Sequence, residues 1–202
     1  MMNGDMKCFW ESIMARCVFW SIVAWLLSGC APLSPMPSLP AHQLDSWRLN
    51  GRIAISTQEN SWTANVHWQQ KGPVYQLRLN APLGQGALLL SGNESGVVMQ
   101  TANNKVFKAR DPDALISKVL KLHLPVTSLH FWIRGLPTPQ PAPQWYQLNE
   151  RGHLHRLRQN GWEVEYGRYV NFQGIWLPKK IFLENHQFKV KIIISNWDSL
   201  VI

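Results

Sequence analysis

Two pairs of side chains in this sequence have the type and spacing that catalysis would use. Glu163 and Glu165 lie two residues apart, so they would share one face of a β-strand, where paired carboxylates can act as general acid and base. The pair alternates with Trp162, Val164 and Tyr166. Alternation of this kind favours the solvated outer face of a strand over an acid–base site.

His153 and His155 form the second pair and would also share a strand face, as metal ligands can. No Cys, Asp or third His stands at ligand spacing beside them, so no metal site is expected. The sequence also lacks a Gly-x-Ser-x-Gly motif, a phosphate-binding glycine loop and a nucleophile with an evident base. We therefore expect no catalytic residues, no cofactor and a function other than catalysis.

Cys30 is the residue whose surroundings predict a specific modification. Basic residues precede an apolar run of 11 residues over 17–27, whereas a bilayer-spanning helix needs about 20. The run leads into Leu27-Ser-Gly-Cys30, the pattern of a bacterial lipobox. These features predict a lipoprotein signal peptide over residues 1–29 and a lipidated Cys30. The alternative is a chance cysteine after a signal peptide that is cut elsewhere.

Removal of the signal peptide would leave 202 − 29 = 173 residues, a length that suits one domain. The formal charge of +8 would suit a nucleic acid partner, but export argues against one. An anionic membrane surface or an acidic protein fits better, and a basic surface without a partner is the alternative. Ala31 stands where Asp commonly retains lipoproteins at the inner membrane, so we expect an outer-membrane location facing the periplasm.

Beyond Cys30, the chain divides into a tether and a folded domain. Four prolines between residues 31 and 41 predict an extended, semi-rigid tether over 30–44, and the domain would cover 45–202. Within the domain, apolar and polar residues alternate over about eleven short segments, and short turns imply antiparallel neighbours. The expected strands lie near residues 49–55, 62–68, 75–79, 88–90, 97–99, 105–109, 145–148, 153–158, 162–169, 175–184 and 188–196.

Helical periodicity interrupts the strands after the sixth segment. Asp111 or Asp113 would cap a first helix. Its apolar side chains at helical spacing are Leu115, Val119 and Leu122. A second helical stretch begins at Pro125 and gives way to an irregular, proline-rich segment over 135–143. Its apolar side chains are Leu129, Trp132 and Ile133. A long antiparallel sheet curls, so one face would become concave, and these helices could cover its mouth.

Eight tryptophans would remain after removal of residues 1–29, a heavy aromatic load. Most of them are expected in a well-packed core, but some could line an apolar pocket for an acyl chain. The candidate lining residues of that cavity are Ile53, Trp62, Val66, Trp68, Leu77, Leu79, Leu88, Leu90, Leu115, Val119 and Trp132.

Several segments of the sequence resemble the LolB family of outer-membrane lipoproteins. They are Gly51-Arg-Ile-Ala54, His67-Trp-Gln-Gln70, Tyr75 to Gly84, Leu124 to Pro137, Trp162 to Tyr166 and Ile193 to Trp197. They follow one another in the family's order over nearly the whole mature domain. The resemblance implies a mainly β fold with a helical insertion. That fold is an incompletely closed, or half, antiparallel β-barrel of the LolA/LolB type, with a helical lid over an apolar cavity.

The resemblance also implies a function. Such a receptor would accept acylated lipoproteins from the periplasmic carrier LolA and insert them into the outer membrane, without nucleotide or metal. Its partners would be a LolA-like carrier, lipoprotein cargo and outer-membrane phospholipid, with no nucleic acid, and the chain is expected to be a monomer. The alternative is a periplasmic lipid- or glycolipid-binding lipoprotein of envelope transport.

Delivery in the family needs an exposed apolar residue in a loop between two strands, and the matching residue here is Leu83. Pro82 and Gly84 flank it and predict a turn tip. Burying an exposed leucine in lipid would contribute about 1.5–3 kcal/mol, too little to anchor the chain. The alternative is a leucine folded back onto the core. The chain departs from the family at 85–87 and in the proline-rich segment 137–143.

Basic side chains near the helices are candidates for binding an acidic face of the carrier. They are Lys118, Lys121 and Arg134. Charge complementarity of this kind speeds complex formation and is weakened by salt. For each of them, the solvated face of a helix is the alternative.

Overall fold

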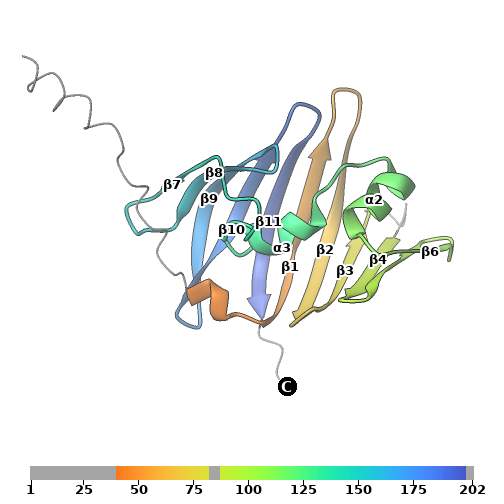
Figure 1. Ribbon diagram of the computed structural model, residues 1–202, viewed down its shortest axis with the longest axis horizontal. Coiled ribbons are helices and arrows are strands. Elements are labelled where there is room, and N and C mark those ends of the chain that lie inside the picture. Colours follow the sequence, from red (N-terminus) through yellow and green to blue (C-terminus); the bar gives the residue numbers. More distant parts are fainter. Residues whose placement is uncertain (1–39, 82–86, 199–202) are drawn as a thin grey trace, which may run out of the picture. The chain divides into compact units, whose positions relative to one another are not determined.

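Eleven antiparallel strands form one sheet in the computed structural model, which describes residues 40–81 and 87–198 (Figure 1). The strands are β1 Ser46–Ser56, β2 Ser61–Lys71, β3 Val74–Asn80, β4 Ala87–Asn93, β5 Gly96–Thr101, β6 Val106–Ala109, β7 Trp145–Leu148, β8 Leu154–Gln159, β9 Trp162–Phe172, β10 Ile175–Glu184 and β11 Lys189–Asp198. Their spatial order is β6-β5-β4-β3-β2-β1-β11-β10-β9-β8-β7. β6 and β7 are the two edges and do not pair with each other, so the predicted open barrel of eleven strands is confirmed.

Several predictions fall outside the described residues. These are the signal peptide over 1–29, Cys30, and the segment Pro82, Leu83 and Gly84. The tether is described only at its end, where Pro40–Gln43 form a short 3-10 helix, η1. That end of the tether is therefore helical, whereas an extended segment was predicted there. In the part of the chain that the structure describes, no helix is both long and apolar enough to cross a membrane.

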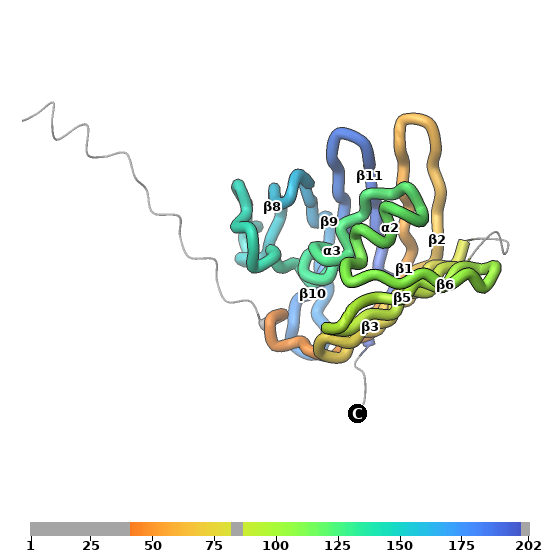
Figure 2. Tube along the Cα trace, turned by 45° about the vertical axis from the view of Figure 1, so that its right-hand side comes forward, coloured from red at the N-terminus to blue at the C-terminus, as the bar shows by residue number. Residues whose placement is uncertain are grey.

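Strict alternation sets which face of the sheet becomes the core. On β2, the side chains of Ala64, Val66, Trp68 and Gln70 are buried, and the residues between them are exposed. The same period of two was read from the sequence, because successive side chains of a strand point to opposite faces. The buried face is the one on which both helices lie (Figure 2).

β1 and β11 are the first and last strands of the chain, and they pair with each other at the centre of the sheet. Their register shifts between Asn50 and Gly51, which forms a bulge. A Cβ atom at Gly51 would overlap with the backbone carbonyl oxygen of Ile193. Only glycine therefore allows the two backbones to approach this closely.

The helical insertion between β6 and β7 contains α2, Pro112–Leu120, and α3, Val126–Trp132. Asp111 caps α2 by accepting a hydrogen bond from the backbone N–H of Asp113, at 2.8 Å. Lys121 adopts a left-handed conformation with φ of 57° and ends the helix. Leu122 therefore lies beyond α2, and its placement on that helix was wrong.

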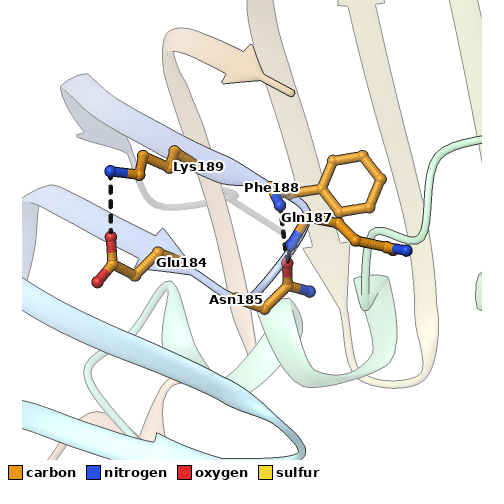
Figure 3. A network of polar contacts seen from close by, with 5 residues as sticks. All are labelled: Glu184, Asn185, Gln187, Phe188 and Lys189. Atoms are coloured by element: carbon orange, nitrogen blue, oxygen red, sulfur yellow. Dashed lines mark hydrogen bonds and ion pairs between the residues drawn. The ribbon is translucent and has the colours of Figure 1, made fainter. Parts of the chain in front are cut away.

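The β10–β11 hairpin is closed by Asn185 (Figure 3). Its Oδ1 accepts hydrogen bonds from the backbone N–H groups of Gln187 at 2.9 Å and Phe188 at 2.8 Å. The turn places the Phe188 ring against Trp162 of β9, with centroids 6.4 Å apart, and Phe188 is buried. The exposed Glu184–Lys189 pair at 3.9 Å flanks the turn and contributes little to stability.

Candidate functional site

An apolar cavity of about 40 Å³ lies between the concave face of the sheet and the two helices. The sheet contributes Ile53, Trp62, Val66, Trp68, Leu77, Leu79, Leu88 and Ile192. The helices and the link between them contribute Ile116, Leu120, Leu124, Val126, Leu129 and Ile133. Every lining residue is apolar, so the cavity suits hydrocarbon and offers no carboxylate, ammonium or amide to a polar ligand.

Seven of the residues predicted for an acyl-chain cavity line this one. They are Ile53, Trp62, Val66, Trp68, Leu77, Leu79 and Leu88. All seven lie on β1 to β4, where the period of two fixes the face without further information. Whether the cavity receives acyl chains is not tested by their position, so that role stays a prediction.

Four predicted residues do not line the cavity: Leu90, Leu115, Val119 and Trp132. Leu115 and Val119 each precede a lining residue of α2 by one position, which corresponds to a rotation of about 100° around the helix. Leu90 is wholly buried on β4 opposite Met99. Trp132 is wholly buried and directed by hydrogen bonds toward β8 and β9.

Residues of the helices and of β11 were missing from the predicted lining. Leu129 and Ile133 were read as apolar positions of the second helix, but nothing in the sequence indicated which part of the sheet they would face. Ile192 belongs to a run of three isoleucines, 192–194, in which alternation makes the neighbouring Ile193 exposed. The signal for Ile192 was therefore present in the strand pattern.

Gln159 forms the buried polar network that fixes α3 to the sheet. Its Oε1 accepts from the indole Nε1 of Trp132 at 3.0 Å and from the backbone N–H of Thr138 at 2.9 Å. Its Nε2 donates to the backbone carbonyls of Thr138 at 3.0 Å and Pro141 at 2.7 Å. All four hydrogen bonds that a carboxamide can make are used, and the side chain is fully buried.

Tyr166 of β9 adds to this attachment, and Tyr169 of the same strand ties β9 to β8. The hydroxyl of Tyr166 donates to the backbone carbonyl of Trp132 at 3.1 Å, and that of Tyr169 donates to the carbonyl of Leu154 at 2.8 Å. Burial raises the pKa of both phenols, so both stay protonated and act as donors. α3 is therefore held by several hydrogen bonds to the β8–β9 side of the sheet.

A second hollow, of about 280 Å³, lies next to the cavity and shares Trp68 and Val126 with it. Gly72 of the β2–β3 turn and Asn93 at the end of β4 contribute to its lining. Its walls combine apolar rings such as Phe131 with polar groups, so it is more polar than the cavity. We call this hollow the turn-side groove.

His130 lies in the turn-side groove and is neutral there. Desolvation by burial, together with the Arg134 guanidinium, lowers its pKa to about 4. Nε2 lies 3.2 Å from an Nη2 donor of Arg134, which can only donate, so Nε2 accepts. Nδ1 therefore carries the proton and donates to Oε1 of Gln70, at 3.2 Å. Trp68 donates to the same oxygen at 3.2 Å.

Arg134 is buried, which contradicts its candidacy as a docking residue for the carrier. Its Nη1 donates to the backbone carbonyls of Leu44 at 3.2 Å and Ala41 at 3.5 Å, and its Nε donates to that of His130 at 3.2 Å. Arg134 thus connects α3 to the end of the tether. Lys118 and Lys121 are exposed, as a docking role would need.

Residues of the two pairs with catalytic spacing make contacts that support the fold. Glu165 forms an ion pair with Arg156 at 2.8 Å on the outer face of the sheet, and Glu163 lies on the same face, as predicted. His153 stacks on the ring of Tyr169 at 5.0 Å between centroids and is buried. Within residues 40–81 and 87–198, no three His, Cys, Asp or Glu side chains are grouped to hold a metal ion.

Comparison with known proteins gives a consistent result. A family profile described as "Outer membrane lipoprotein LolB" matches residues 45–197. The outer-membrane lipoprotein LolB of Ectopseudomonas mendocina is 37% identical over 199 residues, covering 92% of this chain and 97% of that protein. The LolB of Pseudomonas aeruginosa is 34% identical over 186 residues, covering 85% of this chain and 90% of that protein.

One solved structure shows the fold at greater distance. A DUF1329 family protein from Desulfovibrio piger superposes with a TM-score of 0.53 at 11% identity. The match covers 80% of this chain and 89% of that protein. At this identity the similarity concerns the arrangement of strands and helices alone.

Proposed function

This chain belongs to the LolB family, and we propose that its apolar cavity is where the acyl chains of a cargo lipoprotein bind. Membership makes it an outer-membrane lipoprotein that acts as a receptor in lipoprotein localisation, and it is not an enzyme. The observation that supports the proposal is the cavity lined wholly by apolar side chains beneath α2 and α3. Its partners would be a LolA-like carrier, acylated cargo and the phospholipid of the outer membrane.

Transfer by this route would follow a gradient of affinity. Each methylene of an acyl chain that leaves water contributes about 0.8 kcal/mol in any dry site. Carrier, receptor and bilayer all offer such sites, so modest differences between them determine the direction. The cavity would need to bind acyl chains more tightly than the carrier does and less tightly than the bilayer.

The cavity is too small for an acyl chain as it stands. Its volume of about 40 Å³ holds only a few water molecules, since each needs about 10–15 Å³ on the same measure. Uptake would therefore require the helices to move away from the sheet, and in this proposal the observed arrangement of the helices is the closed one. The turn-side groove is the adjoining opening and would be the way in.

α2 is the part of the lid that is better placed to move. α3 is attached to β8 and β9 through Trp132 and to the tether through Arg134. Among the described residues, no hydrogen bond joins α2 to the sheet. The outward side-chain hydrogen bonds of α2 run from Asp113 to the first residues of α3, and its Oδ1 accepts from the backbone N–H of Thr127 at 3.1 Å. Swinging α2 outward would expose apolar surface but break few polar contacts.

A pair of adjacent substitutions on α2 tests the proposal. Leu120 lines the cavity and Val119 does not, while both are partly buried on the same helix. Leu120→Trp in the full chain should fill the cavity and slow transfer of an acylated lipoprotein from a LolA-type carrier by about tenfold or more. Val119→Trp should transfer at nearly the wild-type rate. Equal transfer by both variants would contradict acyl binding at this cavity.

We further propose that Leu83, between Pro82 and Gly84, makes the membrane contact of delivery and that lipid on Cys30 anchors the chain. Both assignments come from the family pattern in the sequence. Leu83→Glu in the full chain should accept cargo normally but fail to release it into liposomes, because a carboxylate opposes insertion. Leu83→Ile is the matched control. Loss of acceptance as well as release would point to a folding defect instead.

The carrier would dock beside the helices, where Lys118 and Lys121 are exposed. Charge reversal of both lysines should slow association with the carrier, and this effect should shrink as salt is added. An unchanged association rate at low salt would exclude this docking surface. The receptor's capacity for free acyl ligands should not change.

A further inference from the structure

A polar hollow of about 320 Å³ lies on the outer face of β1 to β4, opposite the apolar cavity. Two arginines, one histidine, two asparagines, two glutamines and one leucine line it. They come from alternate positions of four neighbouring strands, so they all point away from the core. This outer-face hollow contains none of the residues of the proposed acyl site.

The strand register places the polar side chains in two rows across the sheet. Asn50, His67 and Arg78 are direct partners on β1, β2 and β3. Two residues along, Arg48 pairs with Gln69, which in turn pairs with Gln76. Directly opposed and diagonal side chains in a sheet are within reach of one another. The two guanidinium groups thus stand at opposite corners of a patch of amide and imidazole groups.

Neither guanidinium has a partner in the described part of the chain. The structure gives Arg48 and Arg78 no side-chain hydrogen bond and no ion pair, and Nε of Arg48 is buried without an acceptor. A buried donor left unsatisfied is unfavourable, so the Arg48 side chain would gain from turning toward an anion in the hollow. Within residues 40–81 and 87–198, two positive charges without a partner therefore border one hollow of the outer face.

The carboxylate that stands beside Arg48 in the strand register already accepts hydrogen bonds. Asp198 pairs with Arg48 in the β1–β11 register, but its Oδ2 accepts from Asn196 at 2.6 Å and from Asn50 at 3.4 Å. Asp198 does not line the hollow, and no other acidic residue does. Asn50 in turn accepts from Nδ1 of His67 at 2.6 Å, which fixes the imidazole orientation. The polar wall is thus ordered before any ligand arrives.

We propose that the outer-face hollow binds a phosphate group, held by Arg48 and Arg78. Guanidinium forks match the oxygen geometry of phosphate, and the carboxamides of Gln69, Gln76 and Asn80 add neutral donors. Two separated guanidiniums and three carboxamides offer more donors than the two oxygens of a carboxylate can accept, which favours phosphate. The phosphate belongs to a phospholipid headgroup or to a soluble phosphate ester, since both present the same oxygens.

The test is calorimetric titration of the full-length chain, held in a maltoside detergent that contains no phosphate. The probes are glycerol 3-phosphate and inorganic phosphate, with chloride at equal ionic strength as the reference. Wild type should bind at least one of the phosphate probes saturably. The double variant Arg48→Gln, Arg78→Gln should bind about tenfold more weakly or worse. Its circular dichroism and thermal unfolding should match wild type, because both side chains lie outside the core.

Arg52→Gln is the matched control. Arg52 stands on the same face of β1 and carries the same charge, but it does not line the hollow. It should change affinity by no more than about twofold if the site is specific. An equal loss in the Arg52 variant, or no saturable binding by wild type, would overturn the proposal. If Arg48→Gln, Arg78→Gln proves unstable, the single variant Arg78→Gln should still show a clear loss.

A second arm identifies the source of the phosphate. The full chain is placed in nanodiscs of phosphate-free galactolipid, with or without phosphatidylglycerol, and titrated with the phosphate probe that bound. Competition by phosphatidylglycerol in wild type, absent in the double variant, identifies the headgroup as ligand. Unchanged affinity identifies a soluble phosphate ester. Transfer of lipoprotein cargo, measured on the same samples, separates failure of this site from failure of the receptor function.

Discussion

The indole Nε1 of Trp132 lies 3.0 Å from Oε1 of Gln159, and both side chains are wholly buried. The bond crosses from α3 to β8, over 27 residues of sequence. Because the same amide group also binds both backbone groups of Thr138, the segment that follows α3 is fixed together with the helix. One glutamine thus determines where half of the lid sits on the sheet.

Gln159→Leu should lower the free energy of unfolding by about 2–4 kcal/mol. Leucine is close in size, so the loss comes from leaving the Trp132 and Thr138 groups buried without partners. Chemical denaturation of the full chain measures it. Gln147→Leu on β7 is the control, since Gln147 is exposed and its replacement should cost less than about 0.5 kcal/mol. Similar values for both variants would contradict the role of this network.

Gly51→Ala should destabilise the protein by about 2–4 kcal/mol, because the new methyl group would collide with the backbone carbonyl of Ile193. Strand pairing between β1 and β11 would have to shift at the centre of the sheet. Thermal unfolding compares it with Gly167→Ala on β9, where an added Cβ has only ordinary contacts at 3.5 Å. Gly167→Ala should be nearly neutral, and equal destabilisation by both changes would refute the argument.

The sheet could be predicted from the sequence because its information is local. Alternation on β2 from Trp62 to Trp68 predicts the strand and its inner face without knowledge of the rest of the chain. The neighbouring strands show the same kind of alternation. The turn at Asn185 and the cap at Asp111 are equally local, since each side chain binds backbone groups within three residues. The number of strands followed from these elements, whereas the open edges were expected only from the family resemblance.

The site could be predicted only where the sheet forms it. Leu115 was expected in the cavity and Ile116 lines it, because helical periodicity alone does not fix how a short helix is rotated against a sheet. Arg134 was expected at the surface for a related reason. Its acceptors are backbone carbonyls 90 and 93 residues away, and nothing in the local sequence marks them.

Arg134→Met should loosen the end of the tether while leaving the sheet intact. Methionine keeps much of the apolar stem but cannot donate to the carbonyls of Ala41 and Leu44. Hydrogen–deuterium exchange of the full chain should show at least about tenfold faster exchange over residues 41–45, with β1 protected as before. Arg134→Lys should behave like Arg134→Met, because one ammonium group cannot replace the forked donors of the guanidinium. Full protection in either variant would show that other contacts hold this segment.

His130 should make stability depend on pH between about 4 and 6.5. Burial and Arg134 lower its pKa to about 4 in the folded protein, while the unfolded chain keeps a value near 6.5. In that window the unfolded state binds more protons, so stability falls as the pH is lowered and is retained above it. The ring is partly exposed, so solvent screening limits the loss to about 1–2 kcal/mol.

The measurement compares wild type with His130→Gln by denaturation at several pH values. Other titrating groups, His153 among them, are common to both proteins and cancel in the difference. The stability advantage of wild type over the variant should therefore shrink by about 1–2 kcal/mol between pH 6.5 and pH 4. A difference that stays constant across this range would mean that His130 titrates alike in both states. The hydrogen bonds from Arg134 to Nε2 and from Nδ1 to Gln70 would then fail to hold the neutral imidazole.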